Sequence, residues 1–150
     1  MRIIFVCTGN TCRSPMAEAL AKEAFSQKKM DVEVASRGVS ICCPAGAAVN
    51  AQQAMEEMGL SLKEHISKPL SIEDVKEADF VLTMTDSHKK LLQSLCGETD
   101  AEILTLGEAA GQKGVEIMDP FGQNIDCYRQ CAAQLKELVE KLPEFLLKKK

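Results

Sequence analysis

The segment Ile3–Ser14 constrains the fold of this chain most strongly. It begins with Ile3–Val6, a continuous apolar and largely β-branched run that is typical of a strand buried on both faces. It ends where Ser14 precedes Pro15, a pair that favours the N-cap and the first position of a helix. The sequence therefore predicts a strand that passes into a helix through the short loop Cys7–Arg13.

This loop has the features of an anion-binding site. Successive backbone N–H groups that wrap toward a helix N-terminus favour phosphate-like oxyanions. Gly9 lets the backbone bend without a Cβ atom, and Asn10 tolerates left-handed geometry and can tie the loop together through its amide. The residues predicted to bind a phosphate group are Thr8, Gly9, Asn10, Thr11, Cys12, Arg13 and Ser14.

Cys7 and Arg13 are the residues from which we expect chemistry. A helix N-terminus and a nearby cation favour the thiolate form of a cysteine, and the Ser14 hydroxyl is expected to hold that thiolate. The planar guanidinium of Arg13 matches two phosphate oxygens at once. A cysteine and an arginine separated by five residues also occur by chance, as a structural cysteine and a surface arginine. The position between a strand and a helix favours phosphoryl transfer to sulfur.

The stretch Cys7-Thr-Gly-Asn-Thr-Cys-Arg-Ser-Pro-Met-Ala-Glu18 resembles the signature of the low-molecular-weight protein tyrosine phosphatase family. The resemblance extends through Asp119-Pro120 to the C-terminal helix, and it implies catalysis through a phosphocysteine. It also implies that Asp119 protonates the leaving group and then activates water as a base. Taken without the resemblance, Asp119-Pro120 would be an ordinary turn.

Thr11 and the segment Asp119–Gly122 resemble, more narrowly, the protein-arginine phosphatase branch of Gram-positive bacteria. Tyrosine-specific relatives usually have a bulkier aliphatic residue in place of Thr11 and a tyrosine in place of Phe121. The segment Ser40–Gly46 offers mostly small groups, which fits a slender aliphatic substrate better than a phenyl ring. Thr11 could also be a loop residue that merely suits the backbone.

The narrower resemblance implies that arginine-phosphorylated proteins are the substrates, with Thr11 and Phe121 setting specificity. The alternative substrates are tyrosine-phosphorylated proteins. It further implies opposition to a protein-arginine kinase that marks proteins for Clp-type proteolysis. No metal ion or cofactor is expected.

The seven cysteines do not resemble a disulfide framework, because their number is odd and their spacing irregular. A thiolate nucleophile needs a reducing compartment, so we expect a cytoplasmic protein. Cys12 is predicted to form a reversible disulfide with Cys7 after oxidation, or else simply to pack beneath the loop. No function is assigned to Cys42 and Cys43.

The alternation of apolar patterns predicts one α/β domain over residues 1–150, a three-layer sandwich with a four-stranded parallel sheet. The family resemblance implies the strand order 2-1-3-4, with the phosphate-binding loop after the first strand. A ligand is then expected at the carboxyl ends of the strands. The predicted strands are Ile3–Val6, Val32–Ala35, Asp79–Met84 and Ile103–Leu106.

The predicted helices are Ser14–Gln27, Ala47–Met58, Ser87–Leu95 and Ile125–Leu142. Pro143 is expected to kink the end of the last of them. The segment Gly107–Met118 is expected to be mostly loop. His65 and His88 lie in no nucleophile or metal motif and are predicted to be structural or surface residues.

Composition and cysteine positions weigh against other classes of protein. A net charge of −4 argues against a nucleic-acid binder, and no apolar run reaches the ~18–20 residues of a membrane span. The N-terminus also lacks the pattern of a signal peptide. An arsenate reductase of this fold would need a cysteine relay after the third strand, where only Cys96 occurs. A non-catalytic phosphate sensor would not need Asp119.

Overall fold

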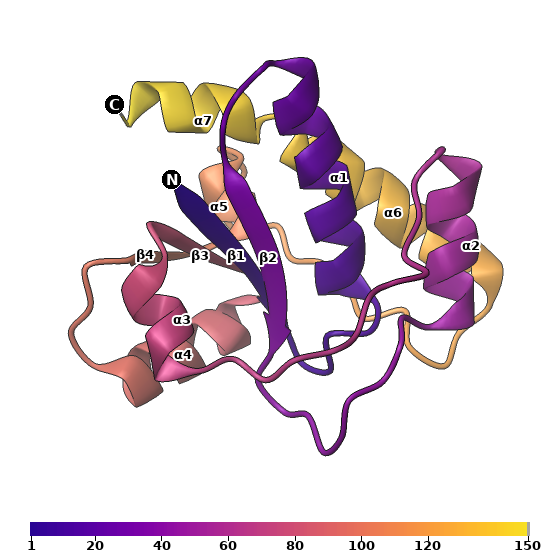
Figure 1. The fold of residues 1–150 in the computed structure, drawn as a ribbon, viewed down its shortest axis with the longest axis horizontal. Helices are drawn as coiled ribbons and strands as arrows, with labels where there is room; N and C mark the ends of the chain where they lie inside the picture. The colour runs from indigo at the N-terminus through magenta and orange to yellow at the C-terminus, as the bar shows by residue number, and fades with distance from the viewer. Residues whose placement is uncertain (150) are drawn as a thin grey trace.

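The computed structural model describes residues 1–149 and shows a central sheet with helices on both faces (Figure 1). The strands are β1 (Arg2–Cys7), β2 (Glu33–Gly38), β3 (Phe80–Thr83) and β4 (Glu102–Thr105). They are all parallel and lie in the order β2-β1-β3-β4. The α/β fold and the strand order 2-1-3-4 are thus confirmed.

The helices divide between the two faces of this sheet (Figure 1). One hydrophobic cluster joins the sheet to α1 (Arg13–Gln27), α2 (Val49–Glu57), α5 (Leu106–Ala109), α6 (Ile125–Val139) and α7 (Leu142–Lys148). A smaller cluster joins the opposite face to α3 (Ile72–Glu77) and α4 (Asp86–Cys96). Within the described residues, no helix is both long and apolar enough to span a membrane.

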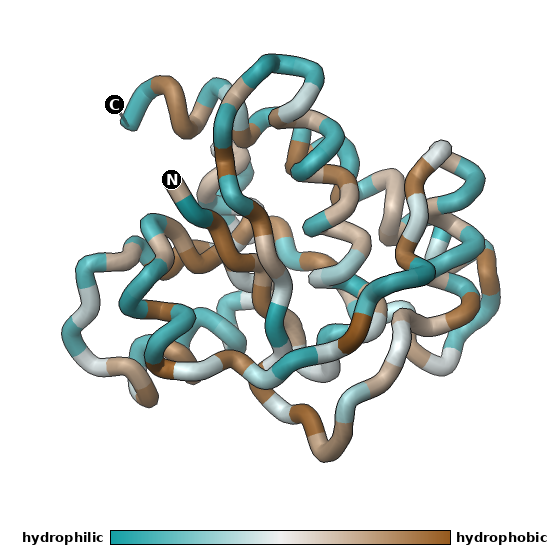
Figure 2. Tube along the Cα trace, in the orientation of Figure 1, coloured by the Kyte–Doolittle hydropathy of each residue, from teal (hydrophilic) through white to brown (hydrophobic). Residues whose placement is uncertain are grey.

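The apolar run of β1 is buried from both sides. Ile3 and Phe5 pack into the larger cluster, and Ile4 and Val6 pack into the smaller one. All four side chains are fully buried because β1 has a neighbouring strand on each edge and helices on each face. Hydrophobic residues accordingly follow the central strands in Figure 2. This explains why the strand shows no alternation of polar and apolar residues.

The predicted N-cap at Ser14 is wrong. Helix α1 already begins at Arg13, Cys12 occupies the cap position, and no side chain caps the first turn. The Ser14 hydroxyl instead contacts the sulfur of Cys7 and the amide of Asn10. It therefore stabilises the preceding loop and not the helix end.

The C-terminal segment and the region before it also differ from prediction. The predicted helix Ile125–Leu142 is two helices, because α6 ends at Val139 and Pro143 lies in the first turn of α7. A proline there loses no intrahelical hydrogen bond, so it starts a helix and does not kink one. The segment predicted as mostly loop contains part of the short helix α5.

Helix α3 was not predicted at all. Its N-terminus has a capping box, in which Ser71 and Asp74 bond reciprocally to backbone N–H groups. The helix is six residues long, which is too short for a clear helical period in the sequence.

Gly38 lies where β2 meets the anion-binding loop. It pairs with Cys7 and ends a strand that is longer than predicted. A Cβ atom at this position would lie 2.7 Å from the Thr8 carbonyl oxygen and 2.8 Å from Cδ1 of Ile41. Only glycine therefore allows β2 and the loop to approach this closely.

We expect Gly38→Ala to lower the free energy of unfolding by about 1–3 kcal/mol, because the added methyl group overpacks against a backbone oxygen. Urea unfolding of the parent and the variant measures the difference. Gly46→Ala is the matched control, since its added Cβ would meet no atom nearer than 3.8 Å. Equal losses in the two variants would contradict the packing argument.

Candidate active site

A cavity of about 190 Å³ lies at the carboxyl end of β1. Its lining residues are Cys7, Thr8, Gly9, Thr11, Cys12, Arg13, Asp119 and Phe121. The structure thus brings the predicted loop together with the distant segment that carries Asp119. A larger cavity of about 780 Å³ lies against α3 and α4, and it contains none of the predicted site residues.

The sulfur of Cys7 is buried and receives two polar contacts. The backbone N–H of Asn10 donates to it at 3.3 Å, and the Ser14 hydroxyl oxygen lies 2.9 Å away. The side-chain amide of Asn10 donates to that same Ser14 oxygen at 2.8 Å, which leaves the Ser14 hydrogen free to point at sulfur. Two hydrogen-bond donors thus converge on the Cys7 sulfur, and donors of this kind stabilise an anionic acceptor.

The loop is held in shape by segments outside it. Asn10 has φ of 55°, the left-handed conformation expected from the sequence. His65 Nε2 donates to the Asn10 carbonyl oxygen at 2.7 Å, and the Lys68 N–H donates to Asn10 Oδ1 at 3.0 Å. The Ala48 N–H donates to the carbonyl oxygen of Thr11 at 2.9 Å.

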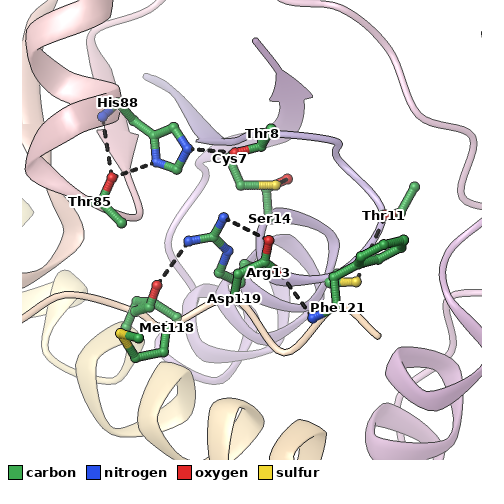
Figure 3. A network of polar contacts seen from close by, with 12 residues as sticks. Cys7, Thr8, Thr11, Arg13, Ser14, Thr85, His88, Met118, Asp119 and Phe121 are labelled. Carbon is green, nitrogen blue, oxygen red and sulfur yellow. Dashed lines mark hydrogen bonds and ion pairs between the residues drawn. The ribbon is translucent and has the colours of Figure 1, made fainter. Parts of the chain in front are cut away.

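Arg13 lies between the loop and the segment before α6 (Figure 3). Its side chain is buried, and Nη1 donates to the Ile117 carbonyl oxygen at 2.9 Å. Nη2 lies 3.6 Å from Asp119 Oδ2. The guanidinium is therefore fixed at the cavity by groups from two parts of the chain.

Asp119 is about half exposed at the edge of the cavity, with a side-chain exposure of 48%. Its Oδ1 accepts the Phe121 N–H at 3.0 Å, a short turn that fixes the direction of the carboxylate. A carboxylate that is both fixed and open to solvent can exchange protons with a bound molecule and with water.

Cys12 lines the cavity from beneath and is buried. Its sulfur lies 3.3 Å from the Tyr128 hydroxyl, and burial raises the pKa of the Cys12 thiol. Burial likewise raises the pKa of Tyr128 and raises that of the neighbouring Cys131 to about 12. Cys7 and Cys12 are both free thiols in the structure.

Both histidines contact the loop, a connection that was not predicted from the sequence. His65 supports Asn10, and His88 lies with Nε2 2.9 Å from Thr8 Oγ1 and Nδ1 2.9 Å from Thr85 Oγ1. A signal for His88 was present, because it follows β3 closely and parallel neighbouring strands end at the same edge. Burial, and then the charge of Arg13, lower the pKa of His88, so its ring is neutral at pH 7.

The family model for low molecular weight phosphotyrosine protein phosphatase matches residues 2–150. The chain therefore belongs to this family of cysteine-dependent phosphatases.

Relatives named for two different substrates are similar to this chain. The protein-arginine-phosphatase of Bacillus subtilis (strain 168) is 42% identical over 148 residues, covering 99% of this chain and 98% of the relative. The low molecular weight protein-tyrosine-phosphatase PtpB of Staphylococcus haemolyticus (strain JCSC1435) is 41% identical over 148 residues, covering 95% of this chain and 97% of the relative. A solved structure of a YwlE arginine phosphatase variant with a phosphorylated active-site serine has a TM-score of 0.93. It is 42% identical, and the match covers 99% of this chain and 97% of that chain.

We expect the stability of the protein to fall as the pH decreases from about 6.5, the ordinary pKa of histidine, toward the lowered pKa of folded His88. In that interval the unfolded chain binds a proton at His88 that the folded chain does not, so acid favours unfolding. Thermal unfolding between pH 5 and 7 measures this dependence. His88→Gln should have a shallower pH dependence, and an unchanged slope would contradict the assignment.

Proposed function

We propose that this phosphatase removes phosphate from arginine residues of proteins through a phosphocysteine intermediate. Relatives named for arginine and for tyrosine are almost equally identical to the chain, so the choice of substrate rests on the cavity. The observation that carries the proposal is that Thr11 and Asp119, a hydroxyl and a carboxylate, line the same cavity as Cys7.

In the first step, the Cys7 sulfur attacks phosphorus and the bond from phosphorus to the guanidino nitrogen breaks. Asp119 donates a proton to that nitrogen, while Arg13 and the loop N–H groups bind the phosphoryl oxygens. The position of Arg13 at the cavity wall supports this role. The phosphorylated active-site serine of the YwlE variant supports a covalent intermediate at the nucleophile position.

In the second step, water attacks the phosphocysteine and the sulfur–phosphorus bond breaks. Asp119 now accepts the proton of water, which its half-exposed position allows. The leaving thiolate is received by the N–H of Asn10 and the hydroxyl of Ser14. No step requires a metal ion or cofactor.

Specificity would come from Thr11 and Phe121. Thr11 offers a hydroxyl to the polar guanidinium group, where an aliphatic side chain would better suit a phenyl ring. Asp119 can pair with the positive charge of the substrate. Phe121 is the aromatic residue among those that line the cavity, and its ring is largely exposed, so it can lie along the aliphatic part of an arginine side chain.

The partners in this proposal are arginine-phosphorylated proteins, and a protein-arginine kinase would oppose the enzyme. A cytoplasmic location follows from the need of the Cys7 thiolate for a reducing environment.

The arrangement of cysteines gives no support to arsenate reduction. Cys7 and Cys12 belong to the hydrophobic cluster on the α1 face, whereas Cys96 packs against the cluster on the opposite face of the sheet. The Cys96 thiol is thus separated from the loop by the sheet itself. A disulfide relay through these three residues would have to cross the sheet.

We expect the parent protein to prefer a phosphoarginine peptide. Thr11→Ile should shift the ratio of kcat/KM values toward phosphotyrosine by about 5- to 150-fold, because one pocket contact contributes only ~1–3 kcal/mol. Phosphate release from two peptides that differ only in the phosphorylated residue measures this ratio. Cys7→Ser serves as the inactive control. A parent that prefers phosphotyrosine would rule out arginine as the substrate and leave the chemistry of Cys7 intact.

We also propose that Cys12 protects Cys7 from overoxidation. Peroxide converts the Cys7 thiolate to a sulfenic acid, and the Cys12 thiol then displaces water to form a disulfide. Both side chains line one cavity, which supports this step. The disulfide would block attack on phosphorus until a thiol reductant restores both residues.

After brief peroxide treatment, dithiothreitol should restore most activity of the parent and little activity of Cys12→Ser, because sulfinic and sulfonic acids are not reduced by thiols. Phosphatase assays before and after reduction measure the recovery. Cys127→Ser is the matched control, because Cys127 does not line the cavity, and its activity should recover like that of the parent. Equal recovery in Cys12→Ser would refute the protective role.

A further inference from the structure

We infer that His88 is a positioning residue, which turns the Thr8 hydroxyl into a hydrogen-bond donor toward a phosphoryl oxygen in the cavity. This inference deepens the proposed phosphatase function and rests on it. Thr8 lines the cavity beside Cys7. His88 lies on α4, the helix that follows β3, and its ring contacts the Thr8 side chain (Figure 3).

A short chain of hydrogen bonds links α4 to the loop. Thr85 caps α4, since its Oγ1 accepts the backbone N–H of His88 at 3.2 Å. The same oxygen lies 2.9 Å from His88 Nδ1, and His88 Nε2 lies 2.9 Å from Thr8 Oγ1. The imidazole, only 9% exposed, therefore lies between two hydroxyl groups.

The donor and acceptor capacity of each group sets the direction of these hydrogen bonds. The Thr85 hydroxyl already accepts one N–H, so we assign its hydrogen to Nδ1, which lies 2.9 Å from the hydroxyl oxygen. A neutral imidazole then carries its proton on Nε2 and donates it to Thr8 Oγ1. In the opposite tautomer, the Thr85 hydroxyl would accept twice and its hydrogen would have no acceptor among residues 1–149.

The Thr8 hydrogen is thereby directed away from His88. Thr8 Oγ1 has no second partner among the described residues, and its side chain lies at the cavity wall. The backbone of Thr8 is fixed, because its carbonyl oxygen accepts the Ser40 N–H at 3.0 Å. A phosphoryl oxygen above Cys7 is the acceptor that this arrangement fits, and a charged acceptor makes such a bond strong.

Protonation of His88 would break only one of these two bonds. A protonated ring donates from both nitrogens, so it would lose the bond from Thr85 but would still donate from Nε2 to Thr8. Burial and the charge of Arg13 lower the pKa of His88, while Asp119 and Glu116 act in the opposite direction. Arg13 lies on α1, and the two carboxylates lie on the segment before α6. The surroundings as a whole keep the ring neutral at pH 7.

The test uses two amides of different length in place of the imidazole. His88→Gln can place an N–H near the position of Nε2, whereas His88→Asn reaches only the position of Nδ1. We expect His88→Asn and Thr8→Val each to lower kcat/KM about 10- to 100-fold, the effect of one hydrogen bond to a charged group. His88→Gln should lose less activity than His88→Asn, and Thr8→Ser less than Thr8→Val, since Gln and Ser can keep the hydrogen bond.

A double variant separates positioning from mere structural support. If His88 acts through the Thr8 hydroxyl, the double variant that carries both Thr8→Val and His88→Asn should lose no more activity than the single variant Thr8→Val. The inference would be overturned if the loss of kcat/KM in the double variant equalled the product of the two single losses. It would also be overturned if Thr8→Val kept full activity. Ser94→Ala, exposed on the same helix, is the control and should match the parent. Thr8 is itself exposed, so Thr8→Val tests the hydroxyl even if His88→Asn does not fold.

Binding of inorganic vanadate distinguishes this inference from the proposed function. A parent that binds vanadate but releases phosphate from neither peptide would refute the proposed function. Weaker vanadate binding by Thr8→Val and His88→Asn, but not by Thr8→Ser and His88→Gln, would still support the link from His88 to Thr8. Equal vanadate binding by all four variants would refute that link.

Discussion

The loop between β1 and α1 depends above all on the backbone and side-chain hydrogen bonds of one buried residue, Asn10. Its backbone N–H donates to Cys7 and its amide nitrogen donates to Ser14, while its two oxygens accept from His65 and from the Lys68 N–H. A fully buried amide would be costly with any of these groups unpaired. The bonds thus hold a left-handed residue in place and keep donors aimed at sulfur.

The sheet determines which groups can reach this loop. β1 lies between β2 and β3, so the ends of both neighbours lie beside the loop. From the β2 side, Gly38 allows close backbone contact, and from the β3 side His88 approaches Thr8. The third contributor, Asp119, belongs to the segment that leads into α6, a helix that packs against α1. The cavity itself is lined by the loop and by the segment of Asp119, while the elements on both sides of β1 support the loop.

In the proposed function, phosphoryl chemistry and substrate choice depend on different parts of the cavity. The groups that contact Cys7 are buried and bonded to one another, and the buried Arg13 is held by the Ile117 carbonyl oxygen, so this end of the cavity is well ordered. Phe121 and Asp119 lie at the exposed rim, where substitutions cost little packing. Under this proposal, a change of substrate would need substitutions only at the rim, which agrees with the nearly equal identity of the chain to relatives named for arginine and for tyrosine.

The sequence by itself determined the central strand, the loop that joins it to the first helix and the α/β class, because these depend on apolar runs and on residues adjacent in the chain. It did not reveal α3, which is too short for a helical period, or the true role of Ser14, whose hydroxyl bonds to the loop and not to the helix end. It also predicted His65 and His88 only as structural or surface residues. Their contacts with Asn10 and Thr8 span 55 and 80 positions, respectively. Only the parallel packing of β1 beside β3 and the path of the chain past the loop bring such distant residues within hydrogen-bonding distance.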